Sequence, residues 1–147
     1  MIYLGADHRG YKAKTKLFDY LLGRGYQVTD MGTNSEEPVD YPLIAAKVGE
    51  KVVEDLNNRG ILLCGSGDGV CIVANKIKGV RAALAWNKEV AMSVRNDDNA
   101  NILCLGADQL AEDEIREITQ TFLDTSFGGQ ERYNRRIKEI SDLEKEN

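Results

Sequence analysis

The segment from residue 61 to residue 76, ILLCGSGDGVCIVANK, joins a thiol to a glycine-rich turn. An apolar run ends on Cys64, glycines follow at positions 65, 67 and 69, and a second cysteine stands at position 71. Four chemistries use a turn of this kind: a nucleotide phosphate loop, a metal site, a redox pair and a catalytic thiol. The spacing of the residues discriminates among them.

Three of these chemistries fit the spacing poorly. A Walker phosphate loop requires lysine and then serine or threonine after its last glycine, whereas Val70 and Cys71 follow here. The even spacing of the glycines differs from the dinucleotide fingerprint, so a nicotinamide site has weak support. Cys64 and Cys71 are too far apart for a redox pair, and a metal site needs more ligands than these two thiols and one distant histidine supply.

The remaining functional interpretation is a basic or nucleophilic thiol at Cys64. The glycines free backbone N–H groups to surround an anionic oxygen, and the N-terminus of the helix that follows adds positive potential. The same surroundings favour a thiolate, which is a competent base. A structural alternative stays open, in which Cys64 is a buried strand residue before a tight turn. Cys71 and Cys104 are expected to be packing residues.

Three other segments carry polar side chains that suit ligand binding. GADHRG, residues 5–10, places Asp7 and the single histidine, His8, after an expected strand, where a structural histidine and a ligand-binding one are both reasonable. RNDDNANIL, residues 95–103, is expected to be a solvated turn. In RYNRR, residues 132–136, two arginines one helical turn apart could hold a phosphate, although a merely charged terminal helix is the simpler interpretation.

The elements that must position these residues alternate along the chain. We expect strands at 2–5, 27–30, 60–64, 80–85 and 102–105, and helices at 11–23, 42–56, 73–76, 88–95, 112–124 and 132–146. This alternation predicts an α/β fold: a single-domain, doubly wound, Rossmann-like parallel sheet over residues 1–147, with a C-terminal helix. Ligands of such folds bind beyond the carboxyl ends of the strands.

Composition excludes several classes of partner. The chain of 147 residues carries a net charge of −5, has no basic tract and has few aromatic residues, so we expect no nucleic acid partner. No secretory signal or membrane-spanning run is visible, and three cysteines without disulfide spacing indicate a cytoplasmic protein. The apolar stripe of Ile137, Ile140 and Leu143 on the terminal helix predicts docking on the parent domain or on a partner subunit.

Taken together, the motifs carry a specific resemblance over nearly the whole chain. They are GADHRGYKAK, GYQVTDMGT, VDYP, GILLCGSGDGVCIVANK, GVRAAL, DNANIL and a terminal RRI after Arg132. In this order they resemble ribose-5-phosphate isomerase B and the related galactose-6-phosphate isomerase subunits. The resemblance implies a doubly wound fold, aldose–ketose isomerisation without a metal or other cofactor, and a homodimer, or a tetramer of paired dimers, with sites built from both subunits.

The resemblance also implies roles for individual residues. Cys64 matches the base that moves a proton between adjacent sugar carbons, Ser66 matches the hydroxyl beside it, and Asp97 takes the ring-opening position. The segment from Gly65 to Gly69 matches the anion hole for a cis-enediolate. The expected substrate-binding residues are Asp7, His8, Arg9, Tyr41, Gly65, Gly67, Asp68, Gly69, Asn99, Arg132 and Arg136.

Four positions depart from the pattern of the family. Asp97 stands where a histidine usually helps to open the furanose ring, and a carboxylate is a poorer general acid at neutral pH. Asp98 replaces an asparagine, and Tyr133 replaces a histidine. Asp108 replaces a phosphate-binding arginine, so either Arg9 takes over part of that role or the substrate differs.

The leading hypothesis is an isomerase that converts D-ribose 5-phosphate to D-ribulose 5-phosphate through a cis-enediolate. The acidic substitutions at positions 97 and 108 keep a second hypothesis open, an isomerase of a hexose 6-phosphate or of an unphosphorylated pentose. A third hypothesis, from another class, is a sugar-phosphate-binding module without catalysis. The glycine loop with its intact cysteine argues for the enzyme.

Overall fold

Five short segments form one parallel sheet with the order β2-β1-β3-β5-β4. The structure, a computed structural model, describes residues 1–147. The strands are β1 (Ile2–Ala6), β2 (Val28–Asp30), β3 (Arg59–Cys64), β4 (Ala82–Leu84) and β5 (Ile102–Gly106). Neighbouring strands that are not consecutive in sequence require crossover connections, and the helices supply them.

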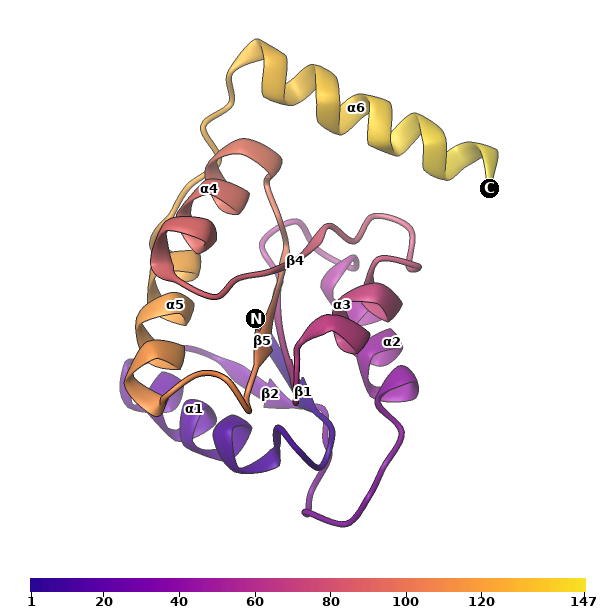
Figure 1. Cartoon of the computed structure of the whole chain (residues 1–147). Helices are drawn as coiled ribbons and strands as arrows, with labels where there is room; N and C mark the ends of the chain where they lie inside the picture. The colour runs from indigo at the N-terminus through magenta and orange to yellow at the C-terminus, as the bar shows by residue number, and fades with distance from the viewer.

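Helices cover both faces of the sheet (Figure 1). They are α1 (Tyr11–Gly23), α2 (Tyr41–Val52), α3 (Asp68–Ala74), α4 (Lys88–Asp98), α5 (Glu112–Asp124) and α6 (Glu131–Glu146). One hydrophobic core lies between the sheet and α1, α4 and α5, and a second lies between the sheet and α2 and α3. The predicted doubly wound α/β fold with a C-terminal helix is therefore confirmed.

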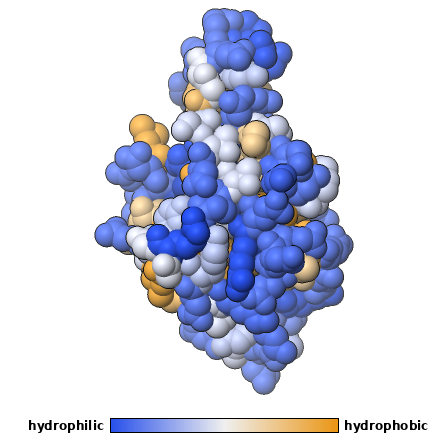
Figure 2. Space-filling view, turned by 90° about the vertical axis from the view of Figure 1, so that its left-hand side faces the viewer, coloured by the Kyte–Doolittle hydropathy of each residue, from blue (hydrophilic) through white to orange (hydrophobic).

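The helices differ in how much of their surface faces solvent. Figure 2 shows that hydrophilic side chains dominate the face formed by α1, α4 and α5, with apolar atoms scattered over it. Helix α6 crosses one end of the molecule, beyond α4 and away from the loops that follow β1 and β3 (Figure 1). None of the six helices combines the length and the apolar composition that crossing a membrane demands.

The three central strands are buried on both faces, as their near-continuous apolar sequences require. Along β3, Ile61 and Leu63 join the core under α1 and α5, whereas Leu62 and Cys64 join the core under α2 and α3. Cys64 pairs with Gly106 of β5, at the carboxyl end of both strands. The alternation of side chains along β3 therefore directs the Cys64 thiol toward the α2 and α3 side.

Several element boundaries differ from the prediction. Helix α2 ends at Val52 and not at residue 56, and the Asn58 side chain donates to the carbonyl of Lys51 at 3.0 Å, which closes the turn that follows. Helix α3 spans 68–74 and not 73–76, because it starts directly after the left-handed Gly67. Strand β4 keeps only residues 82–84 of the predicted 80–85.

A buried lysine fastens α1 to the segment after β2. The side chain of Lys14 is fully buried, and its Nζ donates to Asp30 Oδ1 at 2.6 Å and to the carbonyl of Thr33 at 2.5 Å. Thr33 N–H donates in turn to the carbonyl of Ala6, at the end of β1. Lys14 lies three and seven residues before Leu17 and Leu21, on the buried face of the helix.

We predict that Lys14→Met lowers the free energy of unfolding by about 1–3 kcal/mol, because the Thr33 carbonyl loses its donor and the Asp30 carboxylate keeps only the N–H of Gly32. Urea denaturation measures the change. Lys12→Met on the same helix is the control, since the Lys12–Glu36 ion pair is exposed and its loss should cost less than about 1 kcal/mol. Equal losses for the two variants would contradict a structural role for Lys14.

Candidate active site

The Cys64 sulfur accepts a hydrogen bond from the loop that follows it. Cys64 is 5% exposed, and the backbone N–H of Gly67 donates to its Sγ at 3.1 Å. Gly67 adopts a left-handed conformation with φ of 83°, which turns its N–H back toward the end of β3 and starts α3 at Asp68. The hydrogen bond fixes the sulfur at the carboxyl end of β3, against the first residues of the loop.

The rest of the glycine loop is organised around Ser66 and Tyr41. Ser66 Oγ accepts the N–H of Asp68 at 3.1 Å, and Ser66 borders a pocket of about 350 Å³ that extends toward Trp86. On the other side, a Cβ atom at Gly69 would lie only 2.6 Å from the ring of Tyr41. Glycine at position 69 thus lets the Tyr41 ring lie directly against the loop.

The turn between β1 and α1 presents Asp7 and His8 at the same edge of the sheet. Asp7 is buried, and its Oδ1 accepts the N–H groups of Arg9 at 3.0 Å and Gly10 at 3.1 Å, which fixes the turn. His8 is half-buried, and its Nδ1 accepts the N–H of Val39 at 3.2 Å. The proton of a neutral His8 therefore resides on Nε2, which is left as a hydrogen-bond donor.

The loop after β5 forms hydrogen bonds with the first residues of the glycine loop. Ala107 N–H donates to the carbonyl of Cys64 at 2.8 Å, and Asp108 N–H donates to the carbonyl of Gly65 at 3.1 Å. The Asp108 carboxylate also forms an ion pair with Arg9. Three loops, each following a neighbouring strand, thus converge at the carboxyl edge of the sheet, where ligands of doubly wound folds bind.

A second set of candidate residues lies at the opposite edge of the sheet. Helix α4 starts after the carboxyl end of β4 and runs back, so its last turn, with Asp97, lies near the start of β5. Arg132 and Arg136 are exposed on α6, which packs against α4. Within one chain, these side chains are therefore separated from Cys64 by the length of β5.

The prediction that residues 95–103 begin as a solvated turn is wrong. Residues Arg95 to Asp98 form the last turn of α4, and Asn99 ends the helix in a left-handed conformation with φ of 48°. Arg95 is 3% exposed, and it donates to Asn99 Oδ1 at 2.8 Å and to the carbonyls of Ala100 and Thr125. These bonds let the helix continue through a polar segment and orient the side chain of Asn99.

Two charged groups in the last turn of α4 have shifted pKa values. Burial lowers the pKa of the Arg95 guanidinium to about 10, and repulsion from Arg59 and Arg81 adds to that effect. Burial raises the pKa of Asp98, and the neighbouring Asp97 raises it further, while Arg136 and Arg81 oppose the shift. Arg136 of α6 thus lies near enough to the last turn of α4 to influence Asp98.

The other two cysteines belong to the same side of the sheet as Cys64, in β5 and α3. Burial raises the pKa of Cys104 well above its usual range, as expected for a thiol in the middle of β5. Cys71 is half-buried in α3, and its hydrogen bond with Cys104 is the main influence that lowers its pKa. The prediction that Cys104 is a packing residue agrees with its burial. Any thiol measurement on Cys64 must control for Cys71.

Known proteins resemble this chain in sequence over most of its length. The sequence profile of the Ribose/Galactose Isomerase family matches residues 2–140. The chain belongs to the ribose/galactose isomerase family. It is 36% identical to ribose-5-phosphate isomerase B of Mycobacterium leprae, with alignment over 98% of this chain and 90% of that protein.

Solved structures of family members share the fold throughout. The Mycoplasma genitalium ribose-5-phosphate isomerase B with bound ribulose-5-phosphate has a TM-score of 0.95 and 39% identity, covering 99% of this chain and 97% of that chain. The Clostridium thermocellum ribose-5-phosphate isomerase B has a TM-score of 0.93 and 41% identity over the same shares. The structural similarity to these two family members thus covers the sheet, all six helices and both sets of candidate residues.

We predict that Gly69→Ala lowers the free energy of unfolding by about 1–3 kcal/mol, because the new methyl group overlaps the Tyr41 ring. Alanine is the better helix former, so a loss of stability would report the contact and not the helix. Gly23→Ala is the matched control, since nothing lies within 4 Å of a Cβ atom there, and urea denaturation compares the two. A Gly69→Ala variant as stable as the unaltered protein would mean that the Tyr41 ring is not held against the loop.

Proposed function

We propose that this chain interconverts D-ribose 5-phosphate and D-ribulose 5-phosphate with Cys64 as the base. The observation that carries the proposal is the Cys64 sulfur at the carboxyl edge of the sheet, with the Gly67 N–H donating to it. The Mycoplasma genitalium structure, named for its bound ribulose-5-phosphate, supports the choice of sugar. A thiolate beside a glycine loop suits proton abstraction next to a carbonyl group.

The reaction follows from the arrangement of donors and bases. The thiolate removes the proton from C2 of the open-chain aldose, and the electron pair moves to O1 and forms a cis-enediolate. The backbone N–H groups of Gly65, Ser66 and Gly69 stabilise the oxyanion, since those of Gly67 and Asp68 already donate to Cys64 Sγ and Ser66 Oγ. A proton moves from O2 to O1, and the Cys64 thiol returns its proton to C1, which leaves the ketose and regenerates the thiolate.

The turn after β1 and the start of α2 complete this half of the site. We assign Asp7, His8 and Tyr41 to substrate binding, with the free Nε2–H of His8 and the Tyr41 hydroxyl directed at sugar oxygens. Asp7 acts through the turn, since its Oδ1 is already occupied by two backbone N–H groups. All three residues belong to the edge that carries Cys64.

We further propose that a second copy of the chain supplies the remaining residues, in a homodimer. Asp97, Asn99, Arg132 and Arg136 lie at the far edge of the sheet and cannot reach the Cys64 of their own chain. The arginines are exposed, and Ile140 and Leu143 of α6 are 41% and 62% exposed, which suits a helix that packs on a partner. In this arrangement Arg132 and Arg136 bind the phosphate, and Asp97 assists ring opening.

One observation favours a different sugar for the same chemistry. Asp97 and Asp108 are acidic residues at positions where the resemblance described above implies a histidine and an arginine. A hexose 6-phosphate or an unphosphorylated pentose is therefore the second candidate substrate.

We propose a cytoplasmic location for the enzyme, because three free cysteines fit the reducing environment of the cytoplasm.

We predict that the purified protein forms ketose from ribose 5-phosphate and that Cys64→Ala reduces kcat by at least about a hundredfold, since the proton has no other base. Cys71→Ser should keep full activity, because Cys71 faces away from the loop toward Cys104 and the carbonyl of Ala82. Full activity in Cys64→Ala would refute the base. Faster turnover of galactose 6-phosphate or free ribose would select the second candidate, and binding without turnover of any sugar would select a binding module.

We predict that two inactive variants complement each other when mixed. Cys64→Ala lacks the base, and Arg136→Ala lacks a phosphate ligand at the other edge, so each homodimer should be inactive or weak. Refolding the two together should recover activity toward about one quarter of the wild-type sites, because each mixed dimer holds one intact site. Absence of recovery, with dimers present by light scattering, would contradict a site shared between chains.

A further inference from the structure

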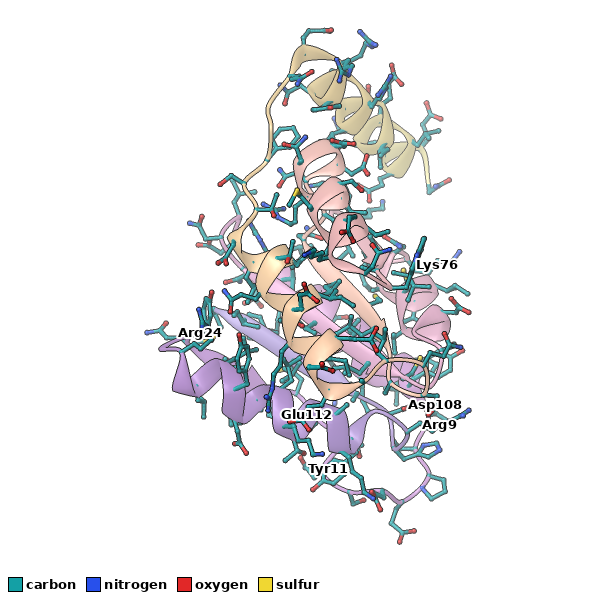
Figure 3. All side chains as sticks on the ribbon, turned by 60° about the vertical axis from the view of Figure 1, so that its left-hand side comes forward. Arg9, Tyr11, Arg24, Lys76, Asp108 and Glu112 are labelled. Atoms are coloured by element: carbon teal, nitrogen blue, oxygen red, sulfur yellow. The ribbon has the colours of Figure 1, made fainter.

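Arg9 and Asp108 meet above the glycine loop. Their side chains come from the turn after β1 and the loop after β5, which are 99 residues apart in sequence, and they form an ion pair through Arg9 Nη2 and Asp108 Oδ2. Figure 3 shows the two labelled side chains next to each other at the end of the molecule. The pair lies at the edge of the sheet that carries Cys64.

Gly65 makes room for this ion pair. A Cβ atom at position 65 would lie 2.8 Å from Arg9 Cζ, 2.8 Å from Arg9 Nε and 2.8 Å from Asp108 Oδ2. The backbone of Gly65 has no positive φ, so its conformation does not demand glycine. The missing side chain therefore serves to bring the guanidinium and the carboxylate against the residue that follows Cys64.

Both partners of the pair are anchored by backbone hydrogen bonds. The N–H of Arg9 donates to Asp7 Oδ1 at 3.0 Å, and the N–H of Asp108 donates to the carbonyl of Gly65 at 3.1 Å. Only Nη2 of the guanidinium is engaged by Asp108, and the Arg9 side chain remains 60% exposed. The guanidinium is thus held in place with most of its five N–H donors free.

The free N–H donors of Arg9 can bind the phosphate group of a substrate. A guanidinium binds a phosphate group through two parallel N–H donors, and a flexible arginine loses conformational entropy when it does so. An exposed ion pair is only weakly favourable by itself, so it offers little resistance to a dianion that shares the guanidinium. A carboxylate that already orients the side chain reduces the entropy lost when the phosphate binds.

We propose that Asp108 is a positioning residue that holds the Arg9 guanidinium against Gly65, where its free N–H groups bind the substrate phosphate. The proposal rests on the proposed function, because the phosphate is that of the sugar. It assigns to Asp108 a favourable role in binding, although its charge has the same sign as that of the phosphate. The opposite view, that Asp108 repels the phosphate, predicts the opposite change in KM.

The test is a double-mutant cycle on Arg9 and Asp108, read as KM and kcat for ribose 5-phosphate. Asp108→Asn should raise KM about two- to tenfold with kcat unchanged, because the carboxylate no longer orients the guanidinium. Arg9→Ala should raise KM about tenfold to a hundredfold, since a charge-assisted hydrogen bond is lost. In the Arg9→Ala background, Asp108→Asn should change nothing further.

Two results would overturn the proposal. One is a lower KM in Asp108→Asn, which would mean that the carboxylate competes with the phosphate. The other is an equal effect of Asp108→Asn with and without Arg9, which would mean that it acts independently of the guanidinium. Lys12→Gln is the control for a general loss of charge, since Lys12 is an exposed neighbour paired with Glu36, and its KM should match that of the unaltered protein.

A binding measurement separates failure of this proposal from failure of the proposed function. Inorganic phosphate is titrated into each variant by calorimetry, which needs no turnover. Weaker phosphate binding in both Arg9→Ala and Asp108→Asn, in a protein that does not isomerise ribose 5-phosphate, would keep the positioning role and reject the substrate. Isomerase activity with unchanged phosphate affinity in Asp108→Asn would reject the positioning role and keep the function.

Discussion

The registers of β1, β3 and β5 determine where Cys64 and the loops around it lie. Leu63 pairs with Ala6 on one side and with Leu105 on the other, so the three strands end within one residue of each other. Their loops must then leave the sheet side by side. Because side chains alternate along a strand, a slip of one residue in β3 would turn Cys64 to the opposite face, away from α3. The apolar burial of both faces makes such a slip costly.

The loops at this edge depend on close approaches more than on unusual backbone angles. Gly69 admits the ring of Tyr41, and Gly65 admits the guanidinium of Arg9 with the carboxylate of Asp108. Only Gly67 needs glycine for its conformation, and that conformation aims an N–H group at the Cys64 sulfur. A loop of alternating glycines therefore accommodates two neighbours and one hydrogen bond that a loop with side chains would exclude.

The sequence predicted the doubly wound sheet and its catalytic edge because both follow from local patterns. Apolar runs followed by glycine or polar turns mark the ends of β1 and β3, and the fold class then brings these ends together. Contacts between distant segments could not be predicted in the same way. The burial of Lys14 depends on partners 16 and 19 residues away, and the Arg9–Asp108 pair spans 99 residues. The last turn of α4 was missed because Arg95 stabilises it through Asn99 and Ala100, which local propensity does not register.

The buried ammonium of Lys14 has a consequence for the loops around the candidate site. It joins α1 to Asp30 and Thr33, while His8 accepts the N–H of Val39 farther along the same loop. Three hydrogen bonds therefore tie α1 and the turn after β1 to the segment before α2, two of them from a fully buried ammonium group. The conformational entropy of these segments is lost when the chain folds and is not lost a second time when a sugar enters. Ordering of these segments on folding thus favours the binding of a sugar whose shape fits the loops as they stand.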